Sequence, residues 1–79
     1  MFLVEFSIAP TGKGESVSAQ VARAVDIVDK SGLDYRLNPM GTVIEGEWDE
    51  VFGTIRKCWE ALSADCDRMQ IVAKADWRR

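Results

Sequence analysis

The order in which two hydrophobic periods follow each other along the chain constrains its fold more than any other feature. Apolar residues alternate with other residues from Phe2 to Ile8, which is the period of a strand with one buried face. A helical period of about 3.6 residues follows, with Ser16 or Ser18 as its N-cap and Ser31-Gly32 as its C-terminal stop. The apolar face of this predicted helix consists of Val17, Val21, Ala24, Val25 and Val28.

The rest of the chain contains two more segments with a strand period, then a second helical period, and then a last strand. The segment Asn38–Gly41 is typical of a turn, so Leu33–Leu37 and Thr42–Glu47 are expected to form a hairpin. We expect Asp49 to cap the second helix and Arg68–Ala75 to form the last strand. The apolar face of the second helix consists of Val51, Ile55, Cys58, Trp59 and Leu62.

The resulting order is β-α-β-β-α-β, which predicts an α+β, ferredoxin-like sandwich with two helices on one face of an antiparallel four-stranded sheet. One offset of 34 residues superimposes the two helix faces, so that Ala24 corresponds to Cys58 and Val28 to Leu62. Two similar helices are therefore expected side by side on one sheet face. The other face is left open to a ligand or a partner subunit.

Length and charge limit the class of protein. A chain of 79 residues is expected to form a single domain over residues 1–79, and domains this small usually need a disulfide, a metal or a partner subunit. Two cysteines and no histidine make association the expected solution. Ten basic against 13 acidic residues give a net charge of −3, whereas nucleic-acid binding needs a basic patch. We expect no nucleic-acid partner.

Membrane and catalytic signatures are weak. No apolar run approaches the roughly 20 residues of a membrane span, and the first residues lack a basic leader, so we expect a cytoplasmic protein without a membrane partner. Without histidine the commonest general base is missing. The segment Thr11–Ser16 departs from the P-loop pattern on both sides of Lys13, which could still help to hold a phosphate tail. Cys58 is expected to be a buried thiol and Cys66 an incidental one, so we expect no catalytic and no metal site.

Acidic residues on the central strands are the informative polar feature. In this topology the first and third strands are neighbours, and Glu5 faces away from the helices. The pattern leaves open which side of the third strand faces the helices; if Ile44 does, Glu5 and Glu45 come together on the open face. Such carboxylates need a cation or strong donors. Either a ligand or pairing with Arg36 or Arg68 would supply them.

Three sequence runs carry a resemblance to a known family. They are EFSI-x-P from Glu5 to Pro10, SGL-x-Y from Ser31 to Tyr35, and PMGT-x-IEGE from Pro39 to Glu47. In these runs the chain resembles the thiamine-binding family of small ferredoxin-like proteins, over about residues 4–52. The resemblance implies a non-catalytic protein that binds thiamine or its hydroxymethylpyrimidine portion. It also implies a homo-oligomer, either a dimer or a tetramer, that assembles through sheet faces and edges.

The resemblance and the open-face geometry together give a set of expected ligand contacts. Thiamine carries a cationic thiazolium, which suits carboxylates, and an aminopyrimidine whose donors and acceptors carboxylate and hydroxyl groups can satisfy. No cofactor other than this thiamine-like ligand is expected. The expected ligand-binding residues are Glu5, Ser7, Asn38, Met40, Gly41, Thr42 and Glu45.

Two departures from the family pattern qualify these expectations, and an alternative function stands beside them. Trp48 and Trp77 stand near strand ends, where they could cover a ring or fill a seam between subunits. Family members continue beyond the last strand with a segment that takes part in assembly, whereas this sequence stops at Arg79. The alternative is an oligomeric regulatory or interaction module whose open sheet face serves assembly instead of ligand binding.

Overall fold

The structure is a computed structural model that describes residues 1–11 and 18–79. The expected cap Ser16, the apolar Val17 and the loop cation Lys13 lie outside the described residues. The element order is β-α-β-β-α-β, as predicted. The elements are β1 (Phe2–Pro10), α1 (Ser18–Lys30), β2 (Asp34–Asn38), β3 (Gly41–Gly46), α2 (Trp48–Ser63) and β4 (Met69–Trp77).

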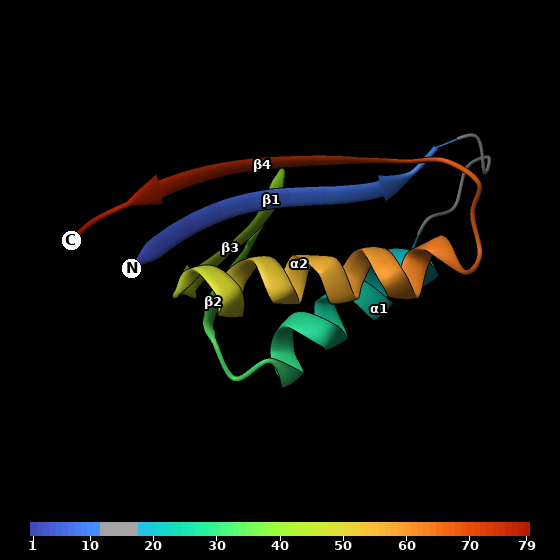
Figure 1. The fold of residues 1–79 in the computed structure, drawn as a ribbon. Coiled ribbons are helices and arrows are strands. Elements are labelled where there is room, and N and C mark those ends of the chain that lie inside the picture. The colour runs from blue at the N-terminus through green and yellow to red at the C-terminus, as the bar shows by residue number, and fades with distance from the viewer. Residues whose placement is uncertain (12–17) are drawn as a thin grey trace.

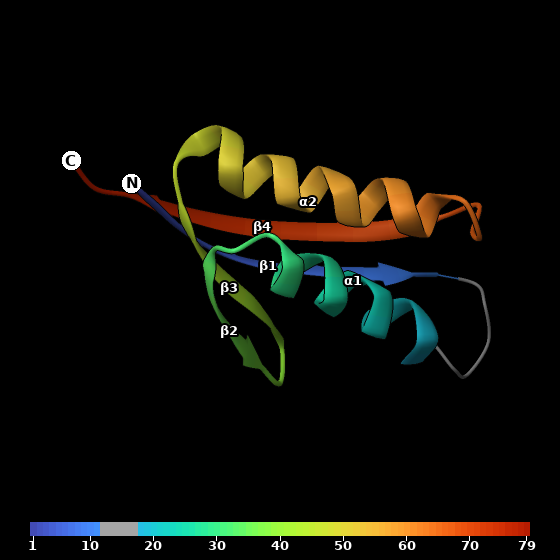
Figure 2. The ribbon, with the colours of Figure 1, turned by 90° about the horizontal axis from the view of Figure 1, so that it is seen from below.

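The four strands form one antiparallel sheet in the order β2-β3-β1-β4, and both helices lie on the same side of it (Figure 1). The predicted α+β sandwich is therefore confirmed. β1 is central: it pairs with β3 from Phe2 to Phe6 and with β4 along its whole length. The β2–β3 hairpin stops part-way along β1, as the view from the helix side shows (Figure 2). This step in the sheet positions the site described below.

The core lies between the sheet and the two helices. Alternation on β1 buries Val4 and Phe6 against the helices, and Ile44 of β3 is completely buried beside them. Ile44 therefore settles which side of β3 faces the helices. The buried apolar residues are Val4, Phe6, Ala24, Val28, Ile44, Val51, Ile55, Cys58 and Leu62.

The helices bury narrower faces than the sequence predicted. Trp59 and Val21 were expected on apolar faces, but their exposed fractions are 44% and 42%. Successive helical residues lie about 100° apart, so Trp59 turns away from the core that Cys58 enters. Thr54 is buried instead, and its hydroxyl donates to the carbonyl oxygen of Glu50 at 2.8 Å.

The start of α2 also differs from the prediction. Glu47, not Asp49, is the N-cap, and β3 ends one residue earlier at Gly46. The Glu50 carboxylate accepts the backbone N–H of Glu47 at 2.9 Å in a capping box. The Glu47/Glu50 spacing, which the sequence displays, was the better signal for the helix start.

β1 and β4, which pair with each other, both extend beyond their predicted ends. β1 continues through Ala9 and Pro10, which were expected in a loop, because they pair with Gln70 and Met69 of β4. β4 runs on to Trp77 and forms one edge of the sheet. Every β4 residue after Met69 is exposed, so the helices leave this edge strand uncovered.

Candidate functional site

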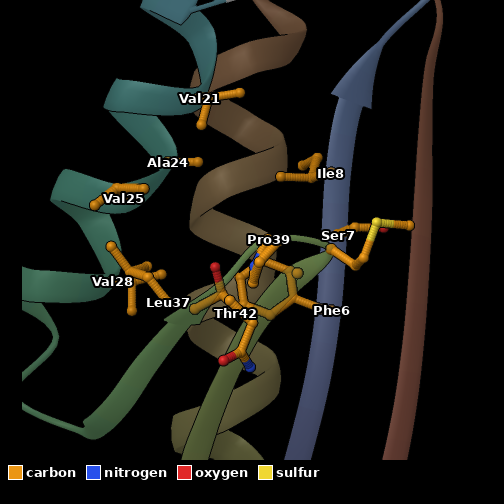
Figure 3. A pocket seen from close by; sticks show the side chains of 13 residues that line it. Phe6, Ser7, Ile8, Val21, Ala24, Val25, Val28, Leu37, Pro39 and Thr42 are labelled. Atoms are coloured by element: carbon orange, nitrogen blue, oxygen red, sulfur yellow. The ribbon is translucent and has the colours of Figure 1, made fainter.

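A pocket of about 340 Å³ lies where the β2–β3 hairpin ends between β1 and α1 (Figure 3). This volume falls in the range of about 300–1,000 Å³ that small-molecule sites occupy. We call it the hairpin-end pocket. It is lined by Phe6, Ser7 and Ile8 of β1, by Val21, Ala24, Val25 and Val28 of α1, and by the hairpin residues Leu37, Asn38, Pro39, Met40, Gly41 and Thr42.

The pocket exists because β1 outruns β3. Pairing between the two strands ends at Phe6 opposite Thr42, while β1 continues to Pro10 beside β4. Because β3 does not extend beside this part of β1, a space remains under α1. Valine and isoleucine side chains line this space. In Figure 3, Val21 and Val28 of α1 lie across this space from Phe6 and Ile8 of β1, whereas Ser7 lies on the other side of β1.

Polar side chains at this pocket come from Ser7, Asn38 and Thr42. Their hydroxyl and amide groups supply both donors and acceptors. Among residues 1–11 and 18–79, none of the three side chains makes a hydrogen bond with another protein group. These groups are therefore available to a ligand at the rim of the pocket, with Thr42 on the helix side of the sheet and Ser7 and Asn38 on its open side.

Glycine at position 41 brings the hairpin close to β1. A Cβ atom there would lie 3.0 Å from the carbonyl oxygen of Phe6 and 3.4 Å from Cγ of Glu5. The Glu5 side chain thus rests against Gly41, on the open-face side of the pocket's edge. Met40, at the hairpin turn, has an exposed fraction of 86%. The structure therefore brings Ser7, Asn38, Met40, Gly41 and Thr42 together, with Glu5 alongside.

The two central carboxylates share the open face without being direct neighbours. Glu5 lies opposite Val43, whereas Glu45 lies opposite Leu3, so the two glutamates are related diagonally. Glu45 lines a second hollow of about 460 Å³ on the open face, together with Asp34 and Arg36. Of the seven predicted ligand residues, five line the hairpin-end pocket, Glu5 lies beside it against Gly41, and Glu45 lies apart from it.

Cations flank Glu5 across the sheet. Lys74 of β4 lies directly opposite it, and Arg36 lies beyond Val43 in the same cross-strand row. Within the described residues no ion pair of Glu5 or Glu45 comes within 4.0 Å. Arg68, the other arginine considered, lies at the far end of β1, where its carbonyl accepts the Thr11 N–H at 2.9 Å. Among the described residues, Arg36 and Lys74 are the cations in the same cross-strand row as Glu5.

Sequence reasoning missed the apolar wall of the pocket. Val21 and Val25 were assigned to the helix core, but both line the hairpin-end pocket together with Ile8 and Leu37. The signal was available in the short hairpin. The alternating pattern of the first strand is longer than that of the third strand. Some residues of α1 therefore have no third-strand residue beneath them.

Cys58 and Cys66 are both free thiols. Burial raises the pKa of the Cys58 thiol to about 11, and the Cys66 thiol donates to the carbonyl oxygen of Leu62 at 3.3 Å. No group of three His, Cys, Asp or Glu side chains that could hold a metal ion occurs in residues 1–11 and 18–79. No helix in this part of the chain has the length and apolar character to cross a membrane.

The sequence and fold of this chain are similar to those of known proteins. A family model described as thiamine-binding protein matches residues 4–79. The UPF0045 protein Mb1933 of Mycobacterium bovis is 43% identical over 77 residues, which cover 96% of this chain and 76% of that protein. Among solved structures, hypothetical protein MJ1052 from Methanocaldococcus jannaschii has a TM-score of 0.91 at 37% identity, covering 99% of this chain and 80% of that one. The domain of unknown function DUF77 from Bacillus cereus has a TM-score of 0.87 at 27% identity, covering 98% and 75%.

Proposed function

Because the chain belongs to the thiamine-binding protein family, we propose that its hairpin-end pocket binds thiamine or the hydroxymethylpyrimidine portion of thiamine without transforming it. One observation carries this proposal: three polar residues, Ser7, Asn38 and Thr42, line a pocket whose other walls are largely apolar. A small aromatic heterocycle needs this combination, an apolar surface for its faces and a few oriented polar groups for its edge.

Each part of the ligand has a matching part of the site. The apolar side chains of α1 and β1 would cover the methylpyrimidine ring, and the flexible thioether of Met40 would close over its exposed side. Glu5, against Gly41, lies where it can meet the cationic thiazolium. Glu45 acts from farther away, as a second negative charge on the open face.

The side chains of the described residues support the proposal of binding without chemistry. In the described residues the Ser7 hydroxyl has no hydrogen-bonded base, and a hydroxyl nucleophile needs one. The proposed role is therefore to hold the ligand, as a buffer or as a carrier for other proteins.

Calorimetric titration with thiamine, hydroxymethylpyrimidine and thiamine phosphate tests the proposal, with an unrelated cationic heterocycle as the control ligand. We expect saturable binding of thiamine and none of the control. Thr42→Val, which replaces a hydroxyl by a methyl group of similar size, should weaken binding about tenfold or more. Glu5→Gln should weaken thiamine binding more than hydroxymethylpyrimidine binding, while Glu60→Gln on the exposed side of α2 should change neither. Unchanged affinity in both Thr42→Val and Glu5→Gln would refute the site.

A second proposal concerns assembly, and the uncovered β4 edge favours it. The chain exposes 5593 Å² of surface, about 800 Å² more than a globular monomer of its mass. Each partner in a standard protein interface buries about that area. A long edge strand with exposed Ile71 and Val72 is a template for pairing with a second copy.

Solution mass tests this assembly directly. The N–H groups of odd-numbered β4 residues point away from β1, because Arg78 and Arg68 bond to Met1 and Thr11. Ala73→Pro therefore removes an outward donor without breaking the β1–β4 ladder. We expect this variant to sediment as a monomer and Ala73→Ser to keep the wild-type mass. An oligomer that forms while none of the thiamine compounds binds would instead favour an interaction module.

A further inference from the structure

The backbone of β1 carries an unused hydrogen-bonding pair beside the hairpin-end pocket. Met1 and Arg78 exchange both of their backbone bonds, at 2.9 and 3.0 Å, and the Thr11 N–H donates to Arg68 at 2.9 Å. Bonding direction alternates along an antiparallel strand. The odd-numbered residues of β1 therefore bond to β4, and the even-numbered residues face the β3 side.

On the β3 side the ladder ends at Phe6, whereas β1 continues to Pro10. Phe6 pairs with Thr42, and the next residue that faces this way is Ile8. The hairpin has turned away by then, and within residues 1–11 and 18–79 neither the N–H nor the carbonyl of Ile8 has a hydrogen-bond partner. Pro10, the next residue in this series, has no N–H, which suits a free edge.

This free edge borders the pocket. Ile8 lines it, and Figure 3 places Ile8 and Phe6 on the same stretch of β1, facing α1 and the hairpin. A donor and an acceptor on one residue of an extended strand present the same pattern that a neighbouring strand would use. A planar heterocycle with an acceptor next to a donor can take the place of that strand.

We infer that the backbone N–H and carbonyl of Ile8 recognise the aminopyrimidine edge of the ligand. This inference rests on the proposed function. The Ile8 N–H donates to the ring nitrogen beside the amino group, and the amino group donates to the Ile8 carbonyl oxygen. The ring thereby extends the sheet where β3 stops. Selectivity for the amino form therefore comes from main-chain groups and not from a side chain.

A ligand comparison on the wild-type protein tests the inference first. In the 4′-oxo analogue of thiamine, a carbonyl replaces the amino group and an N–H replaces the accepting ring nitrogen. Placed in the same orientation, the N–H of the analogue would face the Ile8 N–H, and its carbonyl oxygen would face the Ile8 carbonyl oxygen. We expect the analogue to bind at least about tenfold more weakly than thiamine in calorimetric titration.

A backbone variant tests the same contact from the protein side. Ile8→Pro removes the N–H but leaves the β4 ladder intact, because Ile8 makes no bond to β4. Ile8→Ala is the matched control that shortens the side chain and keeps the N–H. We expect thiamine affinity to fall at least about tenfold further in Ile8→Pro than in Ile8→Ala, with both variants folded by circular dichroism.

The outcomes separate this inference from the proposed function. A wild-type protein that binds no thiamine would overturn both. A wild-type protein that binds thiamine and its 4′-oxo analogue equally would overturn the backbone recognition alone. Equal thiamine affinities for folded Ile8→Pro and Ile8→Ala would do the same. If Ile8→Pro does not fold, the comparison of the two ligands on the wild-type protein decides.

Discussion

The thiol of Cys58 donates to the backbone carbonyl of Ala24, with 3.7 Å between sulfur and oxygen, where α1 packs against α2. Both residues are buried. They are also equivalent positions of the two helices under the common offset that the sequence displays. The offset therefore marks the place where the two helices touch, because each helix presents the same part of its apolar stripe to the other.

Stability should depend on pH through Cys58. Burial raises the pKa of its thiol from an ordinary 9.0 to about 11. As the pH rises, the unfolded chain ionises this thiol first, so the contribution of Cys58 is complete below pH 9 and is lost as the pH approaches 11. Urea unfolding over this alkaline range should show a steeper fall for wild type than for Cys58→Ala. Cys66→Ala, the control at the partly exposed thiol, should follow the wild-type slope.

The capping box predicts a difference between two neighbouring acids. Glu50→Ala removes the acceptor of the Glu47 N–H and should lower the free energy of unfolding by about 0.5–2 kcal/mol. Asp49→Ala removes a charge from the same helix turn but no such bond, so it should cost about 0.3–1 kcal/mol at low ionic strength. Urea denaturation at low and high salt distinguishes them. If both variants lost the same free energy of unfolding, and high salt removed the loss in both, the capping role of Glu50 would be contradicted.

Adjacent residues of β3 should differ sharply in their contribution to stability. Ile44 is completely buried, and Ile44→Ala should cost about 2–5 kcal/mol. Val43 lies on the open face, so Val43→Ala should cost much less. Denaturant midpoints measure both. Comparable losses would mean that a partner covers the open face in solution.

Substitution by alanine should change the stability of the protein in opposite directions at two glycines. Gly41→Ala would push a Cβ to within 3.0 Å of the Phe6 carbonyl oxygen, part of the backbone, and should destabilise the hairpin. Gly53, inside α2, has open space around its missing Cβ, so Gly53→Ala should stabilise by about 0.5–1 kcal/mol. The change in melting temperature on thermal unfolding shows the direction of each effect. A stabilising Gly41→Ala would show that the hairpin can move away from β1 at no cost.

Lys74 provides an electrostatic test of the proposed site. It lies directly opposite Glu5 and competes with a cationic ligand for that carboxylate. Lys74→Ala should therefore strengthen thiamine binding by about two- to fivefold. Neutral hydroxymethylpyrimidine should bind as before, and Lys57→Ala on α2 should change neither affinity. Weaker thiamine binding in Lys74→Ala would place the thiazolium away from Glu5.

Periodicity predicted the elements well where each had one buried face. Alternation from Phe2 and the helical period around Val28 and Leu62 carry over into the structure, because burial on one side selects them. Errors occur at positions that depend on neighbours. Trp59 lies at an apolar position of the helical pattern, but no strand among the described residues covers it. Pro10 belongs to β1 because it pairs with Met69 of β4.

The site was predictable in part for a similar reason. Motif matching pointed to Ser7 and Thr42, which the fold then brings to one pocket. The wall from α1 and the free amide of Ile8 depend on where β3 stops relative to β1, a property of strand register. No residue type signals a register, so these groups appear only once the strands are paired.

Pairing of the first strand with the last imposes an order on folding. β1 has its longest contact with β4, and Met1 and Arg78 are joined at its end (Figure 1). During synthesis β1 leaves the ribosome first and β4 last, so the centre of the sheet has only the short hairpin as a partner until β4 emerges. Closure of this loop, the longest in the sheet, should limit the folding rate. A newly made chain therefore passes through a stage in which its most apolar strand has one edge unpaired, and an unpaired strand edge promotes aggregation.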